Sequence, residues 1–244
     1  MSTGKSKAIK TVLVLITSIF LLITVFFTNF ALVVFDFSHF EEQFDELDRV
    51  EATGMEEQEL YRVTEEILNY LQLQRQDIDI QAEIEGEEQD LFTEREIIHM
   101  EDVQDLFAGG YKVLAGAALL LIVILYFGSS YLQVKYSSSF SARKISLAYL
   151  LRRGALTSLG IMVMVAVVFF MSFDFWYDQL HWWLFDNEYW LLNPEVHNLI
   201  SIYPVPFFYN TLVRIVARTV IYLVGIYLIS LTFPRFSFQG LNKS

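Results

Sequence analysis

Four long apolar runs divide this chain, and they restrict it to a small class of folds. They comprise residues 11–35, 113–133, 155–172 and 215–233. A helix needs about 20 apolar residues to cross the ~30 Å hydrocarbon core of a bilayer. The sequence therefore predicts an α-helical membrane protein with four transmembrane helices. Small residues let membrane helices approach closely, so we expect close helix contacts at Gly154, Gly160 and Gly225.

The charged residues predict the orientation of these helices. Of the 29 acidic residues, 24 lie between Asp36 and Asp105, and the other five lie between Asp174 and Glu195. Loops rich in lysine and arginine stay in the cytoplasm. We therefore expect both termini to be cytoplasmic and both acidic segments to be extracytoplasmic, with the first run kept as an uncleaved anchor. The basic residues that indicate this are Lys5, Lys7, Lys10, Lys135, Arg143, Lys144, Arg152, Arg153, Arg235 and Lys243.

Assigning every residue to one segment gives nine predicted parts. They are a cytoplasmic N-terminus (1–10), the first span (11–35), an acidic extracytoplasmic cap (36–110), the second span (111–133), a basic cytoplasmic loop (134–153), the third span (154–172), an aromatic extracytoplasmic loop (173–210), the fourth span (211–233) and a cytoplasmic C-terminus (234–244).

The acidic cap has the periodicity of a folded, mostly helical (α+β) domain. Apolar residues recur every three or four positions in two stretches, which predicts two amphipathic helices separated near Thr53–Gly54. Alternation of apolar and polar residues from Ile78 to Ile84 predicts a half-buried strand that ends at Gly86. A third helix is expected from Thr93, because Thr93 and Glu96 have capping-box spacing. The helical positions are Phe37, Phe40, Phe44, Leu47 and Val50, then Leu60, Val63, Ile67, Tyr70 and Leu71.

All four tryptophans lie in one stretch, residues 173–190, together with His181. Tryptophan and tyrosine concentrate at the membrane–water boundary, because their rings are apolar while their N–H or O–H groups need polar partners. A histidine held there takes or gives a proton near neutral pH. Asp178 precedes His181 by three residues, so a helix would place the two side by side.

The third predicted cap helix contains a second histidine with the same spacing. His99 lies three residues before Asp102 and four after Arg95, and we expect either aspartate to orient its histidine by holding one ring nitrogen. Each histidine alone is more often a packed or solvated residue, but the two together are candidates for acid–base catalysis. We interpret His39 and His197 as solvated residues.

The sequence lacks the usual signals for other chemistry. It contains no cysteine, which excludes a thiol nucleophile and a zinc–thiolate site. Motifs for serine hydrolases, zinc proteases and nucleotide binding are missing, and we expect no cofactor and no nucleic-acid partner. A metal held by His99, His181 and an acid is an alternative without a ligand signature.

Arg214 and Arg218 are a further pair of candidates near the start of the fourth span. A charged group within lipid is costly unless it is paired or lines a cavity. The two arginines could bind substrate through a phosphate or carbonyl oxygen. Alternatively, they contact lipid headgroups or form a salt bridge to the acidic cap.

Two stretches resemble the bacterial lipoprotein intramolecular transacylase family of four-span membrane proteins. They are FTEREIIHMEDVQDLF at residues 92–107 and FDFWYDQLHWWLFDNEYWLLNPEVHNLISIYPVPFF at residues 173–208. The resemblance implies an enzyme that moves the sn-2 acyl chain of a diacylglyceryl lipoprotein onto the α-amino group of its N-terminal cysteine, leaving a lyso-form lipoprotein. His99 and His181 match the two histidines thought to catalyse this step, while Asn187 and Trp190 match by motif and would shape the pocket.

The resemblance implies a diacylglyceryl lipoprotein and membrane lipid as partners, in the bacterial cell membrane. It leaves open which histidine acts as base, and the oligomeric state. From the residues alone, a non-catalytic membrane receptor or accessory protein is the alternative, with the acidic cap binding a protein partner or cations.

Overall fold

The computed structural model describes residues 3–136 and 140–233 of the chain. The predicted C-terminal segment 234–244, with Arg235 and Lys243, lies outside the described residues, and the side chains of Lys5 and Lys135 are also not described. The chain divides into two compact units. The apolar unit comprises Met1–Asn29, Val113–Val168 and Ile215–Ser244, and the polar unit comprises Phe30–Lys112 and Phe169–Arg214.

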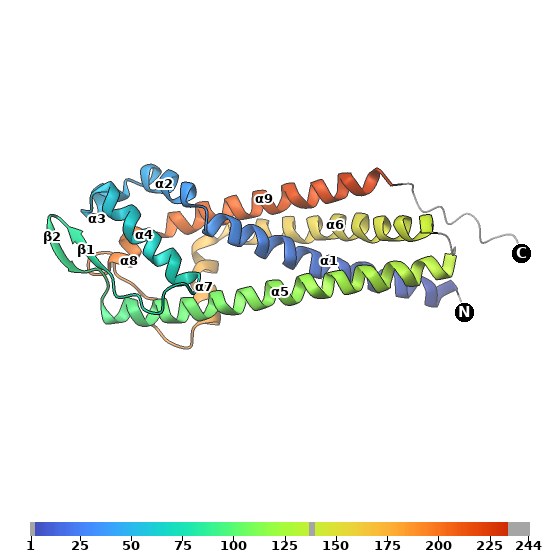
Figure 1. Ribbon diagram of the computed structural model, residues 1–244, viewed down its shortest axis with the longest axis horizontal. Coiled ribbons are helices and arrows are strands. Elements are labelled where there is room, and N and C mark those ends of the chain that lie inside the picture. Colours follow the sequence, from blue (N-terminus) through green and yellow to red (C-terminus); the bar gives the residue numbers. More distant parts are fainter. Residues whose placement is uncertain (1–2, 137–139, 234–244) are drawn as a thin grey trace, which may run out of the picture. The chain divides into compact units, whose positions relative to one another are not determined.

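Four helices in the described ranges are long and apolar enough to cross a membrane, which confirms the predicted fold class. They are α1 (Thr3–Val34), α5 (Glu94–Tyr136), α6 (Phe140–Met171) and α9 (Val205–Leu231), labelled in Figure 1.

The helices extend beyond the apolar runs that predicted them. Most of the predicted loop 134–153 is helical, because α6 already begins at Phe140. Its first turns contain leucine, alanine, lysine and arginine, which favour a helix as strongly as the apolar residues that follow. Likewise α9 begins at Val205 rather than at residue 211. Hydropathy marks the part of a helix suited to lipid, not the helix ends.

Close helix packing in the apolar unit occurs at one of the three predicted glycines. A Cβ atom on Gly154 would lie 3.0 Å from the side chain of Thr17 on α1, so α6 approaches α1 closely there. One turn later, Ser158 Oγ donates a hydrogen bond of 2.8 Å to the carbonyl of Ser18. Gly160 and Gly225 have no neighbouring atom within 4 Å of such a Cβ, so the prediction is wrong for them.

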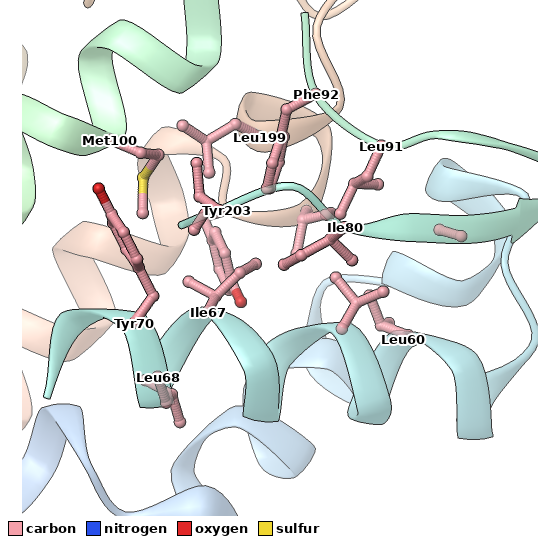
Figure 2. Packing of buried hydrophobic residues seen from close by; sticks show 14 of the residues in the cluster. Leu60, Ile67, Leu68, Tyr70, Ile80, Leu91, Phe92, Met100, Leu199 and Tyr203 are labelled. Atoms are coloured by element: carbon pink, nitrogen blue, oxygen red, sulfur yellow. The ribbon is translucent and has the colours of Figure 1, made fainter. Parts of the chain in front are cut away.

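The polar unit has a core of its own, built from segments far apart in the chain. Helix α4 (Glu57–Leu71) supplies Leu60 and Ile67, and Met100 comes from α5. Ile80 precedes strand β1 (Gln81–Ile84), and Leu199 lies on α8 (Asn198–Ile202). Figure 2 shows these side chains packed together. The amphipathic periodicity predicted the α4 face correctly.

The first predicted cap helix is two helices in the structure. Helix α2 (Phe37–Glu46) ends before Leu47, and α3 (Arg49–Thr53) follows. Asp48 between them has a φ of 54°, in the left-handed region that ends a helix. The Arg49 side chain donates to the carbonyl of Leu47, which satisfies a backbone group left unpaired by the break. The apolar residues keep their three- and four-residue spacing across this turn, so the sequence pattern did not predict it.

The predicted strand forms a hairpin with a second strand. β1 pairs antiparallel with β2 (Glu87–Asp90), and Ile84 is opposite Glu87. The two connecting residues, Glu85 and Gly86, both have positive φ, which is the geometry of a type I′ turn.

His39 is buried rather than solvated, so that interpretation is wrong. Only 1% of it is exposed, and its Nε2 lies 2.9 Å from Thr211 Oγ1 on α9. Its Nδ1 accepts from the Arg214 guanidinium at 2.8 Å, and Arg214 also pairs with Glu42. Burial, with the Arg214 charge, lowers the pKa of His39 to about 4. The neutral imidazole is therefore the form that joins α2 to α9.

This network predicts a pH dependence of stability. Unfolded His39 binds a proton near pH 6.5 while folded His39 does not until about pH 4, so stability should be lost as pH falls between these values. In His39→Gln, the amide keeps one donor and one acceptor without titrating. Thermal unfolding in detergent at pH 7 and pH 5 should show a smaller drop in midpoint for His39→Gln than for the wild type. Equal drops would rule out His39 as a source of the pH dependence.

Candidate active site

The two candidate histidines come together in the polar unit. His99 lies on α5, and His181 lies on α7 (Phe173–Leu184), a helix within the segment predicted as an aromatic loop. Their ring centroids are 6.3 Å apart. The Thr93–Glu96 capping box fixes where α5 begins, since Glu96 Oε2 accepts from the Thr93 backbone N–H and hydroxyl, each at 2.8 Å. The structure thus confirms the predicted cap one turn before His99.

Aromatic side chains surround the pair. The Phe185 ring lies 5.2 Å from that of His99 and 5.7 Å from that of His181. Trp190 stacks on His181 at 4.8 Å with an interplanar angle of 30°. Tyr177 is 4.4 Å from His181 on the same helix. Three aromatic residues of the 173–190 stretch, Tyr177, Phe185 and Trp190, therefore line the space around the histidines.

The hydrogen bond of His181 determines its tautomer. Its Nδ1 lies 2.7 Å from the carbonyl oxygen of Tyr177, one turn earlier on α7. Because a carbonyl only accepts, Nδ1 carries the proton, and Nε2 of the neutral ring has a free lone pair. Burial lowers the pKa of His181 from 6.5, although the Tyr177 carbonyl and Asp178 oppose this effect. A neutral His181 with Nε2 free is ready to accept a proton.

His99 is held by packing rather than by hydrogen bonds. It is 8% exposed, and its Nδ1 is enclosed without a partner among the described residues. Trp190 Nε1 is likewise enclosed and unpaired there. Leaving a buried polar atom unpaired costs about 1–3 kcal/mol. Such atoms are rare, and a ligand or a water molecule often supplies the partner.

The aspartates do not orient the histidines in the way the spacing predicted. Asp102 accepts a 2.8 Å hydrogen bond from Asn187 Nδ2, not from His99. No hydrogen bond joins Asp178 to His181 among the described contacts, because the Tyr177 carbonyl occupies Nδ1 instead. A backbone carbonyl carries no signal in a sequence, so this partner could not be predicted.

The two arginines of α9 differ from each other. Arg214 pairs with Glu42 and His39, which is the salt bridge to the acidic cap weighed as one alternative. Arg218 follows one turn later and makes no hydrogen bond or ion pair with a described residue. His197 lies in the loop before α8, where its ring bonds only to the backbone of Asn193.

These groups support acid–base chemistry. One neutral imidazole accepts a proton at Nε2, and a second lies beside it within an aromatic enclosure. Burial raises the pKa of Tyr177 to about 12, so its phenol stays protonated and does not compete as a base. Within residues 3–136 and 140–233, no group of three or more His, Asp or Glu side chains is arranged to hold a metal ion.

Comparisons with known proteins found a matching family and similar solved structures. A family model described as lipoprotein intramolecular transacylase Lit matches residues 15–208. A solved structure of the membrane integral lipoprotein intramolecular transacylase Lit from Bacillus cereus is similar over 93% of this chain and 96% of its own, with a TM-score of 0.73 and 16% identity.

Two variants of that Bacillus cereus protein, each with one histidine replaced, have the same TM-score of 0.73 at 15% identity. The arginine variant covers 94% of this chain and 94% of its own, and the alanine variant 94% and 96%. A comparison with curated proteins found no match. The solved structures establish the fold, and the family match extends over most of the sequence. The chain therefore belongs to the lipoprotein intramolecular transacylase family and is a multi-pass membrane enzyme.

Proposed function

We propose that this enzyme moves the sn-2 acyl chain of a diacylglyceryl lipoprotein onto the α-amino group of the lipoprotein's N-terminal cysteine. The products are an amide at that cysteine and a free sn-2 hydroxyl, which is the lyso form. The observation that carries the proposal is the pair of imidazoles, 6.3 Å apart in an aromatic enclosure, in a chain of this family. A non-catalytic receptor needs no such pair.

The reaction needs no nucleophile from the protein. The attacking amine and the ester belong to one substrate, and holding them together replaces a collision by a unimolecular step worth roughly 7–11 kcal/mol. The enzyme must bend the substrate, take a proton from nitrogen and give one to the leaving oxygen. The aromatic walls from Tyr177, Phe185 and Trp190 serve the first task, and the histidines serve the other two.

His181 is the group we assign as base. Its Nδ1 proton is engaged with the Tyr177 carbonyl, so the lone pair at Nε2 takes the proton from the ammonium of the substrate. The amine then attacks the ester carbonyl, the bond between that carbon and the sn-2 oxygen breaks, and His99 assists proton transfer to the departing oxygen. The attacking nitrogen gives up one proton to His181 before the attack and a second as the amide forms. One of the two protons ends on the sn-2 oxygen and the other is released to solvent, while one acyl group moves from oxygen to nitrogen.

The site is proposed to face outward from the bacterial cell membrane. Both acidic segments belong to the polar unit, whereas Arg143, Lys144, Arg152 and Arg153 lie in the apolar unit's α6. With positive segments retained in the cytoplasm, the termini lie inside and the histidines outside.

Removing either imidazole should abolish most of the activity. We expect His99→Ala and His181→Ala each to lower the rate of acyl transfer by about 100- to 10,000-fold, the usual contribution of a general acid or base. His197→Ala is the matched control and should retain activity, because that ring bonds only within its own loop. Acyl transfer within one molecule leaves the mass unchanged, so fragmentation of lipoprotein N-terminal peptides by mass spectrometry must locate the chain. Normal conversion by both alanine variants would refute the proposal.

The pH profile tests the assignment of His181 as base. Burial lowers its pKa below 6.5, so the neutral base persists as pH falls, and activity should be lost only below about pH 6.5. An unassisted reaction would instead require the free amine and decline below about pH 8, the ordinary range of an α-amino group. A profile of kcat with saturating lipoprotein separates these outcomes. An acidic limb near pH 8 would contradict proton abstraction by His181.

A further inference from the structure

One segment, residues 185–193, closes over the histidine pair. Phe185 at its start contacts both imidazole rings, and Trp190 near its end stacks on His181. The segment between helices α7 and α8 has no regular secondary structure that would fix its path. Its position must therefore come from contacts with other elements.

Those contacts come from α5, on both sides of His99. Arg95 lies four residues before His99 and Asp102 three residues after it, so all three share one helical face. Arg95 Nε donates to the carbonyl of Leu191 at 3.2 Å, and its terminal nitrogen donates to the carbonyl of Glu188. Its guanidinium also lies 5.6 Å from the centre of the Tyr189 ring.

Asp102 makes the second attachment. Its Oδ2 accepts the 2.8 Å bond from Asn187 Nδ2, while Asn187 Oδ1 accepts from the Tyr189 backbone N–H at 3.0 Å. Asn187 thus uses one end of its amide to shape the turn and the other to bind α5. A hydrogen bond to an ionised group is worth about twice a neutral one, so this attachment is a strong one for its size.

The two attachments enclose the residue that contacts His181. Trp190 lies between Glu188 and Leu191, the residues gripped by Arg95, and it is 8% exposed. Trp182 packs edge-on against it at 5.2 Å. The same helix that carries His99 therefore holds the indole that packs on His181.

We propose that Arg95, Asp102 and Asn187 are positioning residues that clamp segment 185–193 to α5 and so hold His181 at its working distance from His99. This inference rests on the proposed function of the two histidines. Asp102 acts through Asn187 and Trp190, and not by bonding His99. If the clamp is correct, activity requires a hydrogen bond between residues 102 and 187, and it does not depend on which of the two carries the carboxylate.

Exchanging the two partners tests this directly. In Asn187→Asp, two carboxylates face each other and repel, and a misplacement of about 1 Å costs about 100-fold in kcat. Asp102→Asn keeps an amide oxygen that accepts from Asn187, so its loss should be smaller, within about 10-fold. The double exchange Asp102→Asn with Asn187→Asp restores a donor opposite a carboxylate, and its kcat should recover to within about 10-fold of the wild type.

Asn193→Asp is the matched control for the added charge. It places a carboxylate in the same segment, but Asn193 uses its side chain only as an acceptor, for the Glu195 N–H at 3.0 Å. Its activity should be retained. If the double exchange is as slow as Asn187→Asp alone, or if Asp102→Asn is equally slow, the clamp is refuted and a direct effect of the Asp102 charge on His99 is favoured.

A spectroscopic readout separates positioning from general loss of structure. With Trp176, Trp182 and Trp183 changed to phenylalanine, Trp190 is the sole tryptophan and can be excited selectively over the tyrosines. A protonated imidazole in contact with the indole quenches its emission. Emission should fall as pH is lowered and His181 gains a proton. In the same background, Asn187→Asp should lose this pH dependence and the double exchange should regain it. An unchanged response in Asn187→Asp would overturn the inference.

The outcomes keep this inference distinct from the proposed function. If His99→Ala and His181→Ala retain acyl transfer, the proposed function fails, whatever the exchange variants do. If both lose it while Asn187→Asp transfers at the wild-type rate with unchanged Trp190 emission, only the clamp fails. Elution of each variant from size-exclusion chromatography in detergent, compared with the wild type, establishes that the protein measured is folded.

Discussion

The carboxylate of Glu96 is the contact on which the arrangement of the polar unit depends. It is fully buried, and each of its oxygens serves a different element. Oε2 accepts from the N-cap residue Thr93, while Oε1 accepts from the Leu199 backbone N–H at 2.7 Å, at the start of α8. One side chain therefore fixes the beginning of α5 and the position of α8. His99 follows within one turn, so its placement derives from this contact.

Features with local causes could be predicted from the sequence. The four spans follow from runs of apolar residues, and the N-terminus of α5 follows from Thr93 and Glu96 at capping-box spacing. The alternation from Ile78 to Ile84 predicted a strand, which begins only at Gln81, and Gly86 predicted its turn. In each case the residues that decide the structure are neighbours in the chain.

Features that depend on distant partners could not be predicted. His39 was expected in solvent, since nothing near it in sequence announces Thr211 and Arg214. Asp102 has helix spacing to His99 but bonds Asn187, because the folded chain brings that distant amide to it. His99 and His181 were considered together because each has an aspartate three residues away and both were expected on the outer side, and the family resemblance agreed, but no local pattern gives the contact between their rings. Tertiary contacts determine the partners of these side chains, whereas local sequence patterns indicate only which residues could lie near each other on one helix.

The β1–β2 hairpin affects how readily one copy of the protein could pair with another. A two-stranded sheet leaves backbone groups at its outer edges, where a strand from another molecule could add. All four side chains of β2 are exposed, and three of them, Glu87, Glu88 and Asp90, are acidic. A second copy approaching this edge would bring carboxylates against carboxylates. The acidic side chains of the hairpin thus disfavour edge-to-edge aggregation between copies in the same membrane.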